Sequence, residues 1–186
     1  KETEEHKAPF PVAIYGHGYG SNRLEGFLFG WAFVRQGMAS CAIDFPGHGI
    51  ALGERDREEI TSILETLGLM GLMNHLEKGR TSDTNNDGNG DSGSHQWTAD
   101  AFHTRDQVRQ AVVDWMWFVR ALQNCGTGTM DRDGQEVVSC DWDQDGTPDI
   151  GGPDAEIMLA GGSLGGIVNG VAAAVMPEVS ANAPIV

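Results

Sequence analysis

The chain has 186 residues and a formal net charge of −15 at pH 7, from 27 acidic and 12 basic side chains. This length suits a single domain with a sizeable core. The acidic balance argues against nucleic acid and anionic membranes as partners, and the sequence has no run of about 18 apolar residues that could span a membrane.

The sequence begins with two predicted strands that each lead into a glycine-containing turn. Residues 11–15 are apolar and run into His-Gly-Tyr-Gly at 17–20, and a short helix is expected over 26–36. The apolar residues 39–43 predict a second strand, which ends in Asp-Phe-Pro-Gly-His-Gly at 44–49. Apolar strands that alternate with helices predict an α/β fold, in which a mostly parallel sheet is covered by helices on both faces.

An insertion is expected at about residues 51–100. Within 56–78, apolar residues recur at helical spacing with acidic residues on the opposite face, and Gly68 and Gly71 are expected to break the helix into two pieces. This segment is either a lid or pocket wall over a site, or an amphipathic helix packed on the core. Its apolar residues are Ile60, Ile63, Leu64, Leu67, Met70, Met73 and Leu76.

Two aspartate-rich loops share the template D-x-[DN]-x-D-G-x-x-D. Positions 1, 3, 5, 7 and 9 are Asp83, Asn85, Asp87, Asn89 and Asp91 in the first loop, and Asp141, Asp143, Asp145, Thr147 and Asp149 in the second. Oxygens at these positions can converge on one hard cation, and the glycine at position 6 permits the sharp turn. Without a glutamate at position 12, the loops resemble the short calcium loops of secreted repeat proteins. The sequence therefore predicts two structural calcium ions, with two solvated acidic turns as the alternative.

A long helix is predicted over residues 105–122, after a loop over 81–97. Its apolar side chains, Val108, Val112, Trp115, Val119 and Leu122, lie on one face. Arg105, Asp106 and Arg109 are expected to form structural ion pairs.

The sequence Gly-Gly-Ser-Leu-Gly at 161–165 carries the strongest functional signal. It lies between a predicted strand, 156–160, and a predicted helix, 167–176, which Pro177 ends. A G-x-S-x-G at such a corner is a nucleophile elbow, in which glycines permit the close approach of strand and helix. The Ser163 hydroxyl is then expected at the helix N-terminus, where backbone N–H groups can stabilise an oxyanion.

With these motifs the chain resembles the α/β-hydrolase family, and most of all its bacterial secreted lipases and esterases. Those enzymes carry H-G-x-G, D-x-P-G-H-G and G-x-S-L-G-G in this order, and the R-D-x-x-R-Q sequence at 105–110 is also familiar from them. The resemblance covers residues 10–186 apart from the insertions. It implies an α/β-hydrolase fold, incomplete in this chain, and a serine carboxylic-ester hydrolase that acts through an acyl-enzyme. Ser163 is the implied nucleophile, and the N–H groups of Leu164 and Tyr19 form the implied oxyanion hole.

The same resemblance places a catalytic acid and then a histidine after the serine. No Asp and no His follows Ser163, and residues 183–186 look like the start of another strand. None of the six histidines, including His17 in the oxyanion loop, stands in the expected place. We therefore expect an internal part of a larger hydrolase, with the acid and the base beyond residue 186.

The expected partners are an ester or lipid substrate and the rest of the chain's own polypeptide, without an organic cofactor. The expected location is secreted, periplasmic or on the bacterial cell surface. Cys125 and Cys140 bracket a short polar loop and are expected to form a disulfide there, with Cys41 buried in a strand; three reduced thiols are the alternative. The rival functional class is a calcium-stabilised, non-catalytic binding module on a hydrolase scaffold.

Overall fold

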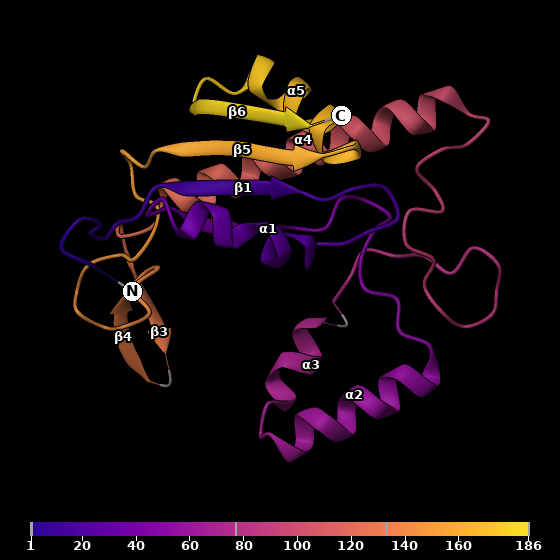
Figure 1. The fold of residues 1–186 in the computed structure, drawn as a ribbon, viewed down its shortest axis with the longest axis horizontal. Helices are drawn as coiled ribbons and strands as arrows, with labels where there is room; N and C mark the ends of the chain where they lie inside the picture. Colours follow the sequence, from indigo (N-terminus) through magenta and orange to yellow (C-terminus); the bar gives the residue numbers. More distant parts are fainter. Residues whose placement is uncertain (1, 77, 133, 186) are drawn as a thin grey trace.

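The computed structural model describes residues 2–76, 78–132 and 134–185 and shows an α/β arrangement built on a four-stranded sheet (Figure 1). The strands lie in the order β2-β1-β5-β6, and each neighbouring pair is parallel. Their carboxyl ends therefore meet at one edge of the sheet, where ligand sites of open α/β sheets form. The bounds are β1 (Val12–Gly16), β2 (Ala39–Cys41), β5 (Ile157–Gly162) and β6 (Val179–Ile185).

Helices cover both faces of this sheet. Helix α1 (Glu25–Val34) lies on the face to which Tyr15 points, and the rings of Tyr15 and Phe29 stack with centroids 5.1 Å apart. Helices α4 (Ala101–Gln123) and α5 (Leu164–Val175) lie on the opposite face (Figure 1), where their side chains form the core with Val12 and Ile14. Neighbouring residues of a strand point to opposite faces, so β1, which is apolar throughout, contributes side chains to the packing on both faces of the sheet.

The core between the sheet and the two helices is densely apolar. Its fully buried members include Ile14, Ile157, Leu159, Trp115, Val119, Leu164 and Val168. Each such side chain contributes about 1.5–3 kcal/mol relative to an exposed one. The second tryptophan of α4, Trp117, lies on the other side of the helix and is 66% exposed.

The predicted insertion forms two helices, α2 (Glu54–Thr66) and α3 (Met70–Leu76), which pack against each other. They extend away from the sheet in Figure 1. The chain breaks at Gly68, whose φ is +69°, while Gly71 lies inside α3. The predicted division into two pieces is confirmed, and the left-handed residue at Gly68 alone produces it.

Cys125 and Cys140 are joined by a disulfide, with Cα atoms 5.4 Å apart. The segment between them was expected to be only a polar loop, but it contains an antiparallel hairpin of β3 (Thr129–Arg132) and β4 (Gln135–Val138). Cys41 is a free thiol and only half-buried, and burial raises its pKa to about 11.

Two elements begin four residues earlier than the sequence predicted. Helix α4 starts at Ala101 rather than residue 105, because the Asp100 side chain accepts hydrogen bonds from the N–H groups of Phe102 and His103 and caps the helix. Strand β6 starts at Val179 rather than residue 183. Most residues of β6 are exposed, and its first half includes the polar residues Ser180 and Asn182. The sequence there lacks the apolar run by which a buried strand is recognised.

Candidate active site

Ser163 stands at the corner between β5 and α5 with φ 54° and ψ −118°. A positive φ is uncommon for a residue with a side chain and is held only where the surroundings impose it. Here the Ser163 N–H donates to the Ile185 carbonyl at 2.7 Å, which ties the corner to β6. The side chain is exposed at the carboxyl edge of the sheet.

The glycines around Ser163 allow strand and helix to approach each other closely. A Cβ atom added to Gly165 would lie 2.0 Å from the Gly16 carbonyl oxygen, and one added to Gly161 would lie 2.7 Å from the same atom. Gly16 and Gly161 are register partners on β1 and β5. No side chain fits in this contact, so the G-x-S-x-G pattern has a steric cause at this corner.

Leu164 is the first residue of α5 and is buried beside the nucleophile. The first four N–H groups of a helix have no acceptor within the helix, and the helix dipole places partial positive charge there. The Leu164 N–H is therefore available next to Ser163, as an oxyanion donor requires.

The loop after β1 passes close to Ser163. A Cβ atom added to Gly18 would lie 3.9 Å from the Ser163 Cβ. The Gly18 carbonyl accepts hydrogen bonds from His17 Nδ1 at 2.8 Å and from the Ser21 N–H at 3.2 Å. In a trans peptide the next N–H points opposite to the carbonyl, so the Tyr19 N–H is directed away from this anchor. Among the described residues no group accepts that N–H.

His17 supports the loop and is fully buried. Its Nε2 accepts the Phe45 N–H at 3.0 Å while its Nδ1 donates to Gly18, which assigns the neutral tautomer with the proton on Nδ1. Burial lowers the pKa of His17, against a smaller raising effect of the bond to Gly18. Both ring nitrogens are occupied, so His17 has no lone pair free for the Ser163 proton.

The other described histidines also lie outside hydrogen-bond reach of Ser163. His48 donates from Nδ1 to the Pro46 carbonyl at 2.9 Å, and His103 Nε2 contacts the His95 carbonyl at 2.9 Å. In the described part of the chain, the Ser163 hydroxyl has no hydrogen-bonded partner. The site therefore contains a serine at a strained strand–helix corner and a neighbouring loop, without a described base that is hydrogen-bonded to the serine.

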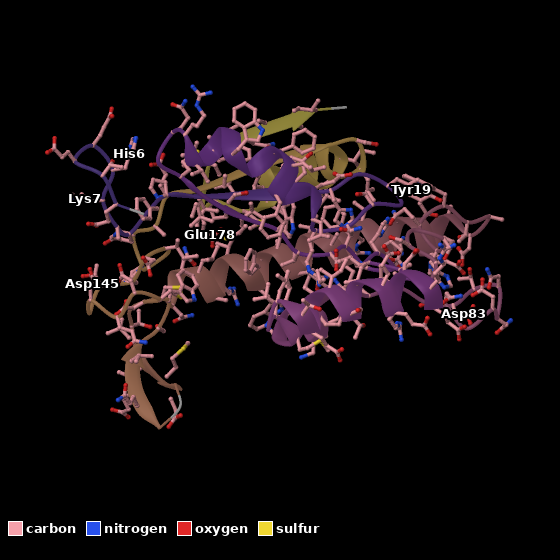
Figure 2. All side chains as sticks on the ribbon, turned by 60° about the horizontal axis from the view of Figure 1, so that its bottom comes forward. His6, Lys7, Tyr19, Asp83, Asp145 and Glu178 are labelled. Atoms are coloured by element: carbon pink, nitrogen blue, oxygen red, sulfur yellow. A yellow bond between two sulfur atoms is a disulfide. The ribbon has the colours of Figure 1, made fainter. Side chains whose placement is uncertain are left out.

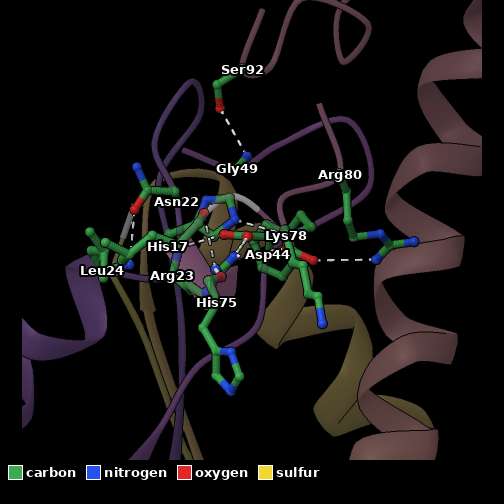
Figure 3. A network of polar contacts seen from close by, with 12 residues as sticks. His17, Asn22, Arg23, Leu24, Asp44, Gly49, His75, Lys78, Arg80 and Ser92 are labelled. Carbon is green, nitrogen blue, oxygen red and sulfur yellow. Dashed lines mark hydrogen bonds and ion pairs between the residues drawn. The ribbon is translucent and has the colours of Figure 1, made fainter. Parts of the chain in front are cut away.

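A charged network holds the turn after β2 (Figure 3). The buried carboxylate of Asp44 pairs with the Arg23 guanidinium and accepts the Arg23 N–H at 2.7 Å. The same guanidinium donates to the carbonyls of His75 and Leu76 at the end of α3. Arg80 donates to the Asp44 carbonyl and pairs with Asp114 of α4. These contacts join the insertion to the edge of the sheet.

The segment after the first acidic loop packs on the oxyanion loop. The Ser92 hydroxyl donates to the Ser21 carbonyl at 2.9 Å and accepts the Gly49 N–H at 3.2 Å. The rings of Tyr19 and Trp97, each about half exposed, lie with centroids 6.0 Å apart. Sequence reasoning assigned no role to Ser92 or Trp97, because their partners are more than 40 residues away along the chain.

The two acidic loops have the same backbone conformation. Position 4 has φ 62° in Asn86 and 63° in Gln144, and position 6 has φ 90° in Gly88 and 92° in Gly146. Position 1 accepts the N–H of position 6, and position 9 accepts that of position 2, in both loops. The loops lie at opposite ends of the molecule, with Asp83 on the side of Tyr19 and Asp145 at the other end (Figure 2).

The loops differ in how their carboxylates converge. Carboxylate oxygens of Asp141, Asp143 and Asp149 lie within 4.8 Å of one another, while Asp145 is not part of this group. In the described ranges this is the only such cluster of acidic, His or Cys ligand atoms. Desolvation and then the negative charge of Asp145 raise the pKa of Asp143, as expected for crowded carboxylates.

In the first loop, position 3 is Asn85, whose amide group donates to Asp87 at 3.0 Å and to Asp91 at 3.5 Å. An amide donor thus lies between two carboxylates, where the second loop has the acceptor Asp143. The first loop therefore has one fewer carboxylate and one more side-chain donor at position 3 than the second loop.

A cavity of about 550 Å³ lies between α1, the edge strand β2 and α3. Phe27, Trp31, Leu72, His75 and Leu76 are among its walls, and Ser163 is not. The insertion therefore walls a cavity beside the sheet edge, at a distance from the serine corner.

No family model matches the chain, and neither the curated proteins nor the solved structures contain a match. Within the described residues, none of the helices is long and apolar enough to cross a membrane. The site's chemistry is therefore argued from its own geometry.

Proposed function

We propose that this chain carries the nucleophile and the oxyanion hole of a serine carboxylic-ester hydrolase of the lipase or esterase type. The backbone of Ser163 carries the proposal. It is a strained, non-glycine residue between a parallel strand and a helix, with an exposed hydroxyl at a helix N-terminus. Strain of about 1–3 kcal/mol per such residue is concentrated at functional sites. The arrangement supports the α/β-hydrolase assignment that the sequence motifs suggested.

In the proposed reaction, Ser163 Oγ attacks the carbonyl carbon of a neutral ester while its proton passes to a general base. The alcohol leaves with a proton returned by that base, and water then hydrolyses the acyl-enzyme by the same route. The N–H groups of Leu164 and Tyr19 stabilise the oxyanion, with a contribution of about 3–4 kcal/mol per donor. Leu164 lies at the start of α5, and no described group accepts the Tyr19 N–H, which supports this role.

The general base is proposed to be a histidine, oriented by an acid, that the described residues do not supply. His17 is fully engaged with Gly18 and Phe45, and the described residues leave the Ser163 hydroxyl without a partner. A serine without a base is a weak nucleophile, so residues 1–186 alone are expected to turn over no ester.

We also propose one calcium ion in each acidic loop, as a structural ion without a role in the chemical step. The convergent carboxylates of Asp141, Asp143 and Asp149 fit a hard cation that prefers oxygen ligands. The first loop shares the backbone conformation and offers Asp83, Asn85, Asp87, Asn89 and Asp91. Calcium loops together with the Cys125–Cys140 disulfide favour a secreted, periplasmic or cell-surface location.

A fluorophosphonate ester probe tests the catalytic proposal on the native polypeptide that contains residues 1–186. The probe is expected to modify Ser163, and Ser163→Ala is expected to abolish both labelling and ester turnover. Ser94→Ala is the control, because this exposed serine only donates to the Asp91 carbonyl in its own loop. Labelling of another serine, or no labelling at all, would overturn the proposal and favour a non-catalytic binding module.

A further inference from the structure

Glu25 is the first residue of α1, and its side chain reaches back to the oxyanion loop. Its Oε2 atom accepts the Gly18 N–H at 2.9 Å, across seven residues of sequence. Glu25 is half-buried, and its N–H donates to the Asn22 carbonyl, which closes the turn between the loop and the helix. This is the one contact of an acidic side chain with the loop at 17–20 in the described part of the chain.

Gly18 lies between Glu25 and the nucleophile. A Cβ atom added to Gly18 would lie 3.6 Å from Glu25 Oε1 and 3.9 Å from Ser163 Cβ. The carboxylate and the serine therefore approach the same side of this glycine. The charge of Glu25 also reaches Tyr15, where it is the second cause, after burial, of a raised pKa.

The contacts of Gly18 fix both peptide planes that flank it. Glu25 holds the His17–Gly18 plane through the Gly18 N–H, while His17 and Ser21 hold the next plane through the Gly18 carbonyl. That second plane carries the Tyr19 N–H. Glycine has wide conformational freedom, so a glycine at this position keeps one orientation only if both planes have partners.

We propose that Glu25 is a positioning residue, which holds Gly18 so that the Tyr19 N–H stays directed at the oxyanion of the Ser163 reaction. The role rests on the proposed function. It depends on an acceptor atom at the end of the side chain and not on the negative charge, which would disfavour a developing oxyanion nearby. Glutamine keeps the acceptor and removes the charge, and alanine removes both.

The chain offers a matched control for the helix position. Glu54 is the first residue of α2, as Glu25 is of α1, and both follow an N-cap without a side-chain hydrogen bond. Glu54→Ala removes the same favourable interaction with a helix dipole but no contact with the oxyanion loop.

The experiment compares Glu25→Ala, Glu25→Gln and Glu54→Ala in the native polypeptide. It measures kcat and KM for a neutral p-nitrophenyl ester and the exchange rate of the Gly18 amide hydrogen. Glu25→Ala is expected to lower kcat about 10- to 100-fold with KM changed less than about threefold, since a misaligned donor costs transition-state stabilisation and not ground-state binding. Glu25→Gln and Glu54→Ala are expected to keep kcat within about threefold of the parent. The Gly18 amide should exchange faster in Glu25→Ala alone.

The outcomes separate this proposal from the function on which it rests. If the parent labels at Ser163 but Glu25→Ala keeps its kcat, or if alanine and glutamine lose activity equally, the positioning role is overturned and the hydrolase proposal stands. If the parent neither labels at Ser163 nor turns over an ester, the proposed function fails and this role fails with it.

Discussion

Arg23 and Asp44 form an ion pair at the carboxyl edge of the sheet, and the Arg23 guanidinium also donates to the carbonyls that end α3. One side chain thus joins the turn after β2, the residues just before α1 and the end of the insertion. Asp44 is almost completely buried, so the removal of either partner leaves a polar group with an unmet need for hydrogen bonds. The helix dipole of α3 favours a cation at the same point.

Asp44→Ala is expected to lower the free energy of unfolding by about 3 kcal/mol, because it leaves a partly buried guanidinium and the Arg23 N–H without their acceptor. It should also make residues 54–76 more sensitive to proteolysis, since the end of α3 loses its anchor. Urea unfolding and limited proteolysis measure the two effects. Asp106→Ala is the control, because Asp106 forms only solvent-exposed ion pairs with Arg105 and Arg109. Its loss should change the free energy of unfolding by less than about 1 kcal/mol. Equal effects of the two variants would contradict the structural role of Arg23.

The close contact between β1 and α5 predicts that Gly165→Ala destabilises the protein. A methyl group there would overlap the Gly16 carbonyl oxygen at 2.0 Å, so Gly165→Ala must push α5 from the sheet. Overpacking of this kind costs about 1–3 kcal/mol or more. Gly170, five residues along the same helix, has no atom within 4 Å of an added Cβ. Gly170→Ala should therefore stabilise the protein by about 0.5–1 kcal/mol. Urea unfolding measures the change in the free energy of unfolding, which should have opposite signs in the two variants. Destabilisation by both would contradict the open space next to Gly170.

The serine corner could be predicted from sequence because its signal is local. The glycines at 161 and 165 and the apolar runs on either side lie within 20 residues, and the observed β5 and α5 agree with them to within three residues. The sequence signal of the acidic loops is also local, because the spacing of Asp, Asn and Gly within nine residues predicts the turn. The parallel four-stranded sheet followed from apolar strands that alternate with helices.

The missed features depend on contacts between distant residues. Arg23 finds its carbonyl partners more than 50 residues away, and Ser92 reaches back 71 residues to Ser21. The Glu25 contact with Gly18 is closer in sequence but needs the turn at 19–24 to fold back. The hairpin inside the disulfide was missed because β3 and β4 are short, polar and largely exposed. Such strands lack the apolar alternation by which strands are recognised.

The buried histidines predict how stability depends on pH. Burial lowers the pKa of His17 and of His48 below the ordinary value of 6.5. The unfolded chain then binds more protons than the native state as the pH falls below about 6.5, so the free energy of unfolding should fall with it. Urea unfolding at pH 7.5, 6.5 and 5.5 measures this trend. A native state equally or more stable at pH 5.5 would contradict the neutral, doubly bonded His17 on which the oxyanion loop depends.

Calcium in the second acidic loop should stabilise the start of the sheet. Position 1 of the loop, Asp141, directly follows the disulfide residue Cys140. Position 9, Asp149, accepts the Phe10 N–H with its carbonyl at 2.8 Å, two residues before β1 begins. An ion that holds positions 1 and 9 together therefore connects the disulfide loop to β1, through the pairing of Phe10 with Ile150. Strand β1 in turn leads into the loop at 17–20.

Millimolar calcium is accordingly expected to raise the melting temperature, and a chelator to lower it. A ligand at 100 times its Kd adds about 2.7 kcal/mol to the free energy of unfolding, which corresponds to about 5–10 °C for a chain of this size. Asp143→Ala should remove most of the response, because Asp143 is one of the three convergent carboxylates, and Asp87→Ala a smaller part, because position 3 of the first loop is the neutral Asn85. Asp154→Ala is the control, since it removes one exposed charge just outside the second loop. An unchanged melting temperature with calcium, or the same response in Asp143→Ala and Asp154→Ala, would contradict a calcium ion at 141–149.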